Sequence, residues 1–220
     1  MKLKDILSNF NGSSDEDSLQ RIFEELAPSL LYGGYLQIHN DFQVFIKTVE
    51  FYYHSEKENG IHDPIVYHRN IRNVDGTVFR KVPYFPTMSL HAHNSGFDIT
   101  FENETEEYRA SVLIRAYEVK DKDGNFLIWG KNEESKEYMF LPSLSYGFNT
   151  QSTYLYSLLN GFPLGVANDI LWIDSPRQQS ALPEQKPRKN VFKSESEWKY
   201  IPLKNDKCGR LWSFTRKEKV

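Results

Sequence analysis

Hydrophobic positions near the start of the chain repeat with the period of a helix. In the segment SSDEDSLQRIFEELAP, residues 13–28, Leu19, Ile22, Phe23 and Leu26 fall on one face. Serine and aspartate residues that can cap a helix precede them, and Pro28 is expected to end it. We expect residues 1–12 to be loosely ordered and residues 13–220 to form a single domain.

From Leu30 onward the pattern becomes typical of strands. Two segments rich in β-branched and aromatic residues, LLYGGYLQI and FQVFIKTVEFYY, are joined by the turn-forming residues 39–41, which predicts a β-hairpin. A turn at Asp75–Gly76 precedes a short predicted strand over residues 78–82. Closely spaced antiparallel strands are expected to follow in SLHAH, FDITFEN, YRASVLIRAYEVKD and NFLIW.

The last third of the chain mixes both patterns. After Phe148 the apolar spacing returns to that of a helix, and ILWID then reads as a short buried strand. Residues 175–190 have the composition of a surface loop, and the segments KYIPL and RLWSFTR are strand-like. The sequence therefore predicts a β-rich α+β fold built around a sheet.

Composition supports one folded domain and excludes several classes of protein. A chain of 220 residues with 15% aromatic side chains can bury one core. Cys208 is the single cysteine, so neither an internal disulfide nor a cysteine zinc site is available. No apolar run reaches the ~20 residues of a membrane span, and the start lacks a signal-peptide pattern, so we expect a cytoplasmic protein without a membrane partner.

The net charge of −3 is unevenly distributed. Residues 176–220 hold 12 Lys or Arg against 5 Asp or Glu, a local charge of +7, which leaves −10 for residues 1–175. Basic residues such as Arg188, Lys189 and Lys193 could bind a polyanion, or they could belong to a solvated tail.

Glu50 and Arg115 are charged residues in predicted buried strands. Glu50 lies in IKTVEFYYH and Arg115 in SVLIRAY, where a charge is costly without a partner. We expect the two charges to meet across the sheet, either as a structural ion pair or as part of a functional site.

Histidines cluster in the middle of the chain and suggest a second kind of site. His91 and His93 have strand spacing i and i+2, so with His62 or Asp63 they could hold a divalent metal. Such pairs also arise by chance and usually have no special role.

Taken in order, the segments resemble the alkyladenine (3-methyladenine) DNA glycosylase family over most of the chain. FIKTVEFYYH resembles that family's catalytic strand, in which a tyrosine follows the glutamate by two places, and SVLIRAYE resembles the strand with its active-site arginine. The resemblance implies a single domain with a curved antiparallel sheet, or partly open barrel, and flanking helices, a fold also called formyltransferase C-terminal-like. It implies no cofactor, no obligate protein partner, and damaged DNA as the substrate.

The resemblance also implies a mechanism in which a nucleotide is flipped into an aromatic pocket. Glu50 would activate the water that hydrolyses the N-glycosidic bond of an alkylated or deaminated purine, and Arg115 would hold the charged site in order. Four residues would flank the base: Tyr52, His62, His91 and His93. DNA would be contacted by Arg69, Arg72, Asn94, Ser95, Arg188, Lys189 and Lys193.

The sequence departs from the family where DNA contact is expected. The family's alternating tyrosines are replaced by His91 and His93, and the position that wedges into the duplex is Asn94 or Ser95, both small and polar. These departures leave two alternatives to a DNA glycosylase: a non-catalytic binding protein that retains the fold, and a metal-dependent enzyme built on His62, His91 and His93.

Overall fold

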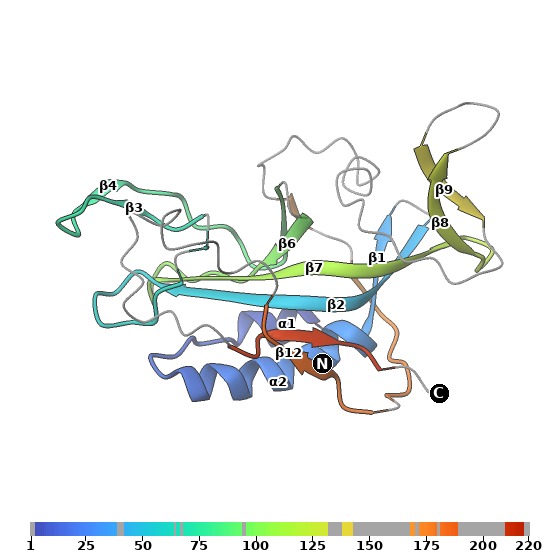
Figure 1. Cartoon of the computed structure of the whole chain (residues 1–220), viewed down its shortest axis with the longest axis horizontal. Helices are drawn as coiled ribbons and strands as arrows, with labels where there is room; N and C mark the ends of the chain where they lie inside the picture. The colour runs from blue at the N-terminus through green and yellow to red at the C-terminus, as the bar shows by residue number, and fades with distance from the viewer. Residues whose placement is uncertain are drawn as a thin grey trace.

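The structure is a computed structural model that describes residues 3–38, 42–63, 65–66, 68–93, 96–131, 138–142, 168–169, 172–179, 181–188 and 210–217. Over these residues the chain forms one β-rich α+β fold, in which a curled antiparallel sheet resembling half a barrel packs on two helices (Figure 1). Neither helix combines the length and the apolar character needed to cross a bilayer.

The chain begins with a short helix, α1 (Leu3–Ser8), which corrects the expected loose N-terminus. Leu3 and Leu7 lie one helical turn apart and are both buried, and Phe10 follows them into the same core. The aromatic ring of Phe10 packs against those of Tyr53, Phe101 and Tyr108. The terminus is therefore held by hydrophobic burial.

Helix α2 (Glu16–Tyr32) starts where the sequence predicts and ends later. The Asp15 side chain caps it by accepting from the Ser18 N–H at 2.8 Å. Pro28 lies inside the helix, so its expected role as the stop is wrong. A proline within a helix costs roughly 3 kcal/mol, but Leu30 and Leu31, both fully buried, contribute roughly 1.5–3 kcal/mol each. The burial of Leu30 and Leu31 therefore explains why the helix continues beyond Pro28.

The main sheet has the order β10-β5-β6-β7-β2-β1-β11. In addition, β8 pairs with β7 and β9 pairs with β8, while β13 pairs with β2 and β12 pairs with β13. Its strands are β1 (Gly34–Ile38), β2 (Phe42–Ser55), β5 (Ser89–His93), β6 (Gly96–Thr100), β7 (Tyr108–Asp121), β8 (Phe126–Lys131), β9 (Tyr138–Pro142), β10 (Asn168–Asp169), β11 (Trp172–Asp174), β12 (Glu184–Lys186) and β13 (Ser213–Thr215). A separate two-stranded sheet pairs β3 (Ile71–Arg72) with β4 (Val78–Arg80).

Most predicted strands are confirmed. β1 and β2 form the predicted hairpin, with Leu36 opposite Val44, and β5 to β8 follow the predicted antiparallel order. The predicted loop over residues 175–190 contains the short strand β12. The predicted helix after Phe148 and the strand KYIPL lie outside the described residues.

The two central strands, β2 and β7, separate a hydrophobic face from a polar one. Val49, Phe51 and Tyr53 on β2 alternate into the hydrophobic core shared with the helices. Glu50, Tyr52 and His54 alternate onto the opposite face. On β7 the same alternation puts Ile114, Val112 and Ala110 in the core and Arg115, Leu113, Ser111 and Arg109 on the polar face.

Arg109 anchors one end of this polar face although its side chain is fully buried. Its guanidinium contacts Glu56 at 3.2 Å and Glu102 at 3.1 Å, and it donates to the backbone oxygens of Val82 and Pro83. The guanidinium carbon also lies 3.5 Å from the centre of the Tyr84 ring. Arg109 therefore fastens the loop before β5 to the sheet.

We predict that Arg109→Ala lowers the free energy of unfolding by about 3–5 kcal/mol, because it leaves the Glu56 and Glu102 carboxylates buried without their shared cation. Arg21→Ala, on the exposed side of α2, is the matched control and should change it by less than about 0.5 kcal/mol. Urea unfolding followed by circular dichroism measures both. Equal effects would show that the Arg109 contacts do not stabilise the fold.

Candidate functional site

Glu50 lies at the centre of the sheet, which limits how it can be reached. Its backbone pairs with Leu113 of β7 on one side and with Ser213 of β13 on the other. The side chain is only 1% exposed. Because β2 has partners on both edges here, a ligand could approach Glu50 only from the polar face of the sheet.

Arg115 reaches Glu50 from a local irregularity of β7. Thr48 pairs with Ala116 and Val49 with Ile114, so the register leaves Arg115 without an opposite residue on β2. Lys47 is skipped in the same way on the other strand. Irregularities of this kind bend a strand and redirect side chains, and they are common beside functional sites.

The predicted meeting of the two charges is confirmed. Arg115 Nε lies 2.7 Å from Glu50 Oε2, and the Tyr52 hydroxyl donates to the same oxygen at 2.8 Å. The Arg115 side chain is 22% exposed, so the pair is open to solvent mainly on the arginine side.

Burial and nearby charges keep Tyr52 and Arg115 protonated beside Glu50. Burial, and after it the Glu50 charge, raises the pKa of Tyr52 far above its usual value, so the phenol keeps its proton. Burial is the largest single influence on Arg115 and lowers its pKa, but the electrostatic interactions with Glu50 and Tyr52 and the hydrogen bonds to both together outweigh it, so the pKa rises. Tyr52 and Arg115 therefore remain donors to Glu50 throughout the neutral range.

Arg188 belongs to this group rather than to a DNA-binding surface, which corrects its expected role. Its side chain is 1% exposed and lies 2.6 Å from Asp63 Oδ2. The guanidinium carbon is 4.6 Å from the centre of the Tyr52 ring and 5.0 Å from that of Trp212. It also donates to the backbone oxygen of Phe51 at 3.2 Å. Asp63, expected only as a possible metal ligand, is fully buried as its partner.

His62 contacts His54 rather than the Glu50 group. Its ring lies 5.3 Å from that of His54, and its Nε2 is 2.9 Å from the backbone oxygen of Lys57. His54 is four residues beyond Glu50 on β2, about 13 Å along a strand. Of these two histidines only His54 is buried. The sequence does not distinguish them, since each has one apolar or aromatic neighbour and one polar neighbour in the chain.

His54 is held in its neutral form. Its Nδ1 accepts a hydrogen bond from the Asp63 N–H at 3.1 Å. Burial lowers its pKa well below the usual value, and the nearby His62, Arg69 and Arg72 act in the same direction.

The remaining predicted contacts are scattered. Arg72 donates to the backbone oxygens of Gly76 and Glu56, and Arg69 to that of Asn70, all at the far end of the polar face. The register puts His91 opposite Asp98, which is opposite Leu113, the partner of Glu50. His91 is thus three strands from Glu50, roughly 14 Å along the sheet. The structure describes the backbone of His93 as well, while Asn94, Ser95, Lys189 and Lys193 lie outside the described residues.

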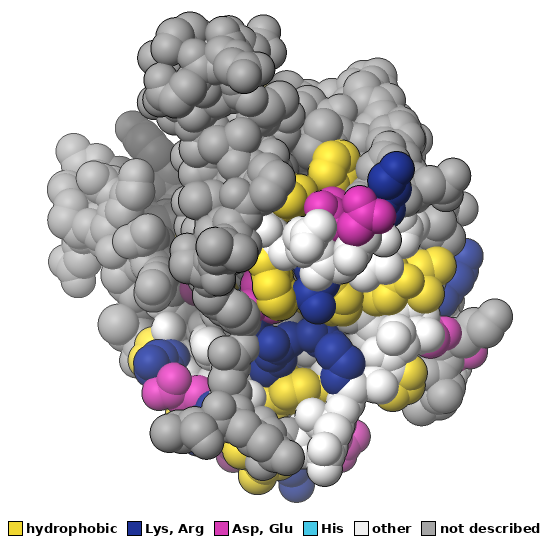
Figure 2. Space-filling model, turned by 90° about the vertical axis from the view of Figure 1, so that its right-hand side faces the viewer, with side chains coloured by type: hydrophobic (Ala, Val, Ile, Leu, Met, Phe, Trp, Pro, Cys, Tyr) yellow, Lys and Arg dark blue, Asp and Glu magenta, His cyan; other side chains and the backbone are white. Residues whose placement is uncertain are grey.

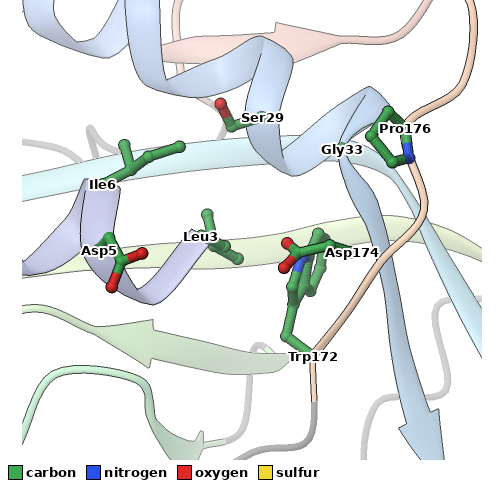
Figure 3. Close-up of a pocket in the computed structure, with 8 residues that line it drawn as sticks. All are labelled: Leu3, Asp5, Ile6, Ser29, Gly33, Trp172, Asp174 and Pro176. Carbon is green, nitrogen blue, oxygen red and sulfur yellow. The ribbon is translucent and has the colours of Figure 1, made fainter. Parts of the chain in front are cut away.

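Two further features bear on ligands. The described residues contain no group of three or more His, Cys, Asp or Glu side chains arranged to hold a metal. A hollow of ≈ 420 Å³ lies between α1, the end of α2 and β11, as Figure 3 shows. It is lined by Leu3, Asp5, Ile6, Ser29, Gly33, Trp172, Asp174 and Pro176. None of these residues belongs to the Glu50 group.

The arrangement defines a class of site: a buried carboxylate oriented by an arginine and a phenol on the polar face of a half-barrel sheet. Such a carboxylate can hold a water molecule, accept its proton or stabilise a nearby positive charge. No protein-family model, curated protein or solved structure matches the chain.

We predict strong energetic coupling between Glu50 and Arg115. Either Glu50→Gln or Arg115→Met alone should lower the free energy of unfolding by about 3 kcal/mol, because each leaves a buried group without its partner. The double variant should lose less than the sum, with a coupling energy above about 1 kcal/mol.

The exposed pair Lys57 and Glu106, 3.5 Å apart and half exposed on both sides, is the matched control for this cycle. Its coupling energy should stay below about 0.5 kcal/mol. Denaturant unfolding of the four proteins in each cycle gives both values. Additive losses at Glu50 and Arg115 would show that the contact contributes nothing beyond its parts.

We predict that His54 makes the protein less stable as the pH falls below about 6.5. The unfolded chain gains a proton there and the native state, whose His54 pKa is lowered, does not. Stability should therefore fall between pH 6.5 and 5 by up to about 1.4 kcal/mol per pH unit from this residue. In His54→Asn, whose Oδ1 can accept from the Asp63 N–H, unfolding measured at several pH values should lack this slope.

Proposed function

We propose that this chain hydrolyses the N-glycosidic bond of a damaged purine, alkylated or deaminated, in nucleic acid. The observation that supports the proposal is the convergence of Tyr52 and Arg115 on one oxygen of Glu50, in the interior of the sheet. An acid so placed and so oriented has the features expected of a general base. We also propose that the half-barrel is a divergent form of the glycosylase fold that the sequence resembles.

In the proposed reaction Glu50 accepts a proton from water while the water oxygen forms a bond to the sugar carbon C1′. The bond between C1′ and the purine nitrogen breaks, and its electron pair leaves with the base. Arg115 keeps the Glu50 carboxylate oriented through Nε, and Tyr52 donates to the same oxygen. A purine alkylated at a ring nitrogen carries positive charge and leaves as a neutral base, whereas a deaminated purine leaves as an anion that takes a proton from water. The proposed reaction needs no cofactor.

A non-catalytic binding protein is the second candidate, and one observation favours it. Arg188 already lies against the Tyr52 ring, the surface on which a base would stack, and Glu50 is almost fully buried. Both features suit a polar network whose role is to hold the fold. A metal-dependent enzyme based on His62 gains no support, because His62 contacts His54 and the Lys57 backbone.

We predict that the protein forms abasic sites in oligonucleotides that contain hypoxanthine or 7-methylguanine, tested as single strands and as duplexes. Glu50→Gln should slow the reaction by about 10²–10⁴-fold, because it removes the base that activates water. Alkaline cleavage of end-labelled strands measures the abasic sites. Glu104→Gln, an exposed carboxylate, is the matched control and should react at the unchanged rate.

Circular dichroism of Glu50→Gln separates loss of chemistry from loss of fold. Full activity in a folded Glu50→Gln protein would contradict the proposed role of Glu50. If the unchanged protein binds these oligonucleotides at low salt and cleaves none of them, the second candidate is correct. If it neither binds nor cleaves them, the glycosylase proposal is wrong.

A further inference from the structure

The hairpin β3–β4 extends from one end of the molecule as an arm (Figure 1). We define the arm as residues 69–82. Its tip is a tight turn in which the Gly76 N–H donates to the Asn73 oxygen at 3.0 Å and the Asn73 N–H to the Thr77 oxygen at 2.8 Å. Gly76 has φ +86°, a conformation that favours glycine. Asp75 Oδ1 accepts from both the N–H and the hydroxyl of Thr77.

Apolar side chains project from this arm into solvent. Val74, at the corner of the turn, is 97% exposed, and Phe79 is 73% exposed. Turn corners normally carry polar residues, so a valine there is unusual. Ile71 and Val78 are also exposed, and the other exposed large hydrophobic residues among those described, Leu182 and Leu211, lie outside the arm. Apolar surface concentrated in this way commonly marks a binding site.

The base of the arm is fixed by hydrogen bonds to the polar face of the sheet. Arg72 donates to the Glu56 backbone oxygen at 2.7 Å, and the Asn70 N–H donates to Glu56 Oε1 at 2.8 Å. Within the arm, Asn70 also accepts from the Val82 N–H at 2.9 Å. The fully buried Arg109 donates to Asn70 Oδ1 and to the Val82 oxygen. The arm is thus held in position before any partner arrives, which lowers the entropic cost of binding.

The charge of the arm indicates its partner. Arg69, Arg72, Arg80 and Lys81 stand against the single carboxylate of Asp75, which gives the arm +3 in a chain of net −3. Lys and Arg side chains also gather at the opposite end of the molecule (Figure 2). There the cations Arg177 and Lys120 lie over the ring of Phe45, which is buried. In the arm, by contrast, the ring of Phe79 is exposed to solvent. Cationic charge next to exposed apolar side chains suits phosphates and base edges.

We propose that the arm binds DNA: Arg80 and Lys81 contact phosphates, and Val74 and Phe79 make apolar contacts with the bases. The arm would then supply the apolar contact with the bases that is expected at the wedge position. Asn94 and Ser95 are too small and polar to make this contact. The choice of DNA rests on the proposed function. The test of the arm measures binding to undamaged DNA, which involves no hydrolysis. A protein whose arm does not bind DNA and a protein that does not hydrolyse the N-glycosidic bond therefore give different results.

Binding of a fluorescein-labelled 20-base-pair duplex is measured by anisotropy from low to moderate salt. Arg80→Gln/Lys81→Gln should lower the slope of log K against log salt by about 0.9 for each phosphate that the variant no longer neutralises. Val74→Ser/Phe79→Ser should weaken binding at least about fivefold with the slope unchanged. The two double variants thus report on the charged and the apolar contacts separately.

Matched controls lie elsewhere on the surface. Leu182→Ser removes an apolar side chain that is 77% exposed, and Lys122→Gln removes an exposed cation from another turn. Both should bind DNA as the unchanged protein does. The proposal is wrong if the arm variants, folded by circular dichroism, bind normally, or if the controls lose as much. It is also wrong if Val74→Ser/Phe79→Ser abolishes binding to anionic phosphatidylserine vesicles, or dimerisation, and leaves DNA binding intact.

Discussion

Buried charge on one face of the β2–β7 pair is the constraint on which the rest of this structure depends. Each charged group removed from water costs several kcal/mol unless a partner and hydrogen bonds compensate it. Glu50 and Arg115 compensate each other within the sheet, whereas Arg109 draws Glu56, Glu102 and the loop before β5 towards it. Segments distant in sequence supply the other partners. Arg188 meets Asp63 across 125 positions, and Arg216 approaches Glu118 at 3.7 Å.

The features of the fold that depend on local sequence pattern were predicted correctly. The alternation of apolar residues located β1, β2 and β5 to β8. The contact between Glu50 and Arg115 was predictable because charges of opposite sign in otherwise apolar strands each need a partner. The start of α2 was marked by its cap at Asp15.

The predictions that proved wrong depended on tertiary burial. Pro28 is a local stop signal, but the burial of Leu30 and Leu31 outweighs the lost backbone hydrogen bond. Helix α1 has six residues, which is too short for its sequence alone to predict it, and the burial of Leu3 and Leu7 in the hydrophobic core stabilises it. Arg188 lies in a basic segment whose composition predicts an exposed surface. Its neighbours in the sequence do not indicate that it is buried in an ion pair with Asp63.

Arg188 also decides how a substrate could use this site. Displacing it from Tyr52 would separate it from Asp63, and breaking a buried pair costs about 3–5 kcal/mol. Stacking one base on an aromatic ring contributes only about 1–3 kcal/mol. A base therefore gains nothing by replacing Arg188, and catalysis in the proposed reaction requires approach beside Arg115, whose side chain is the exposed member of the pair. In that arrangement Arg188 and Asp63 stay in place and fix the Tyr52 ring, so that its hydroxyl continues to orient Glu50.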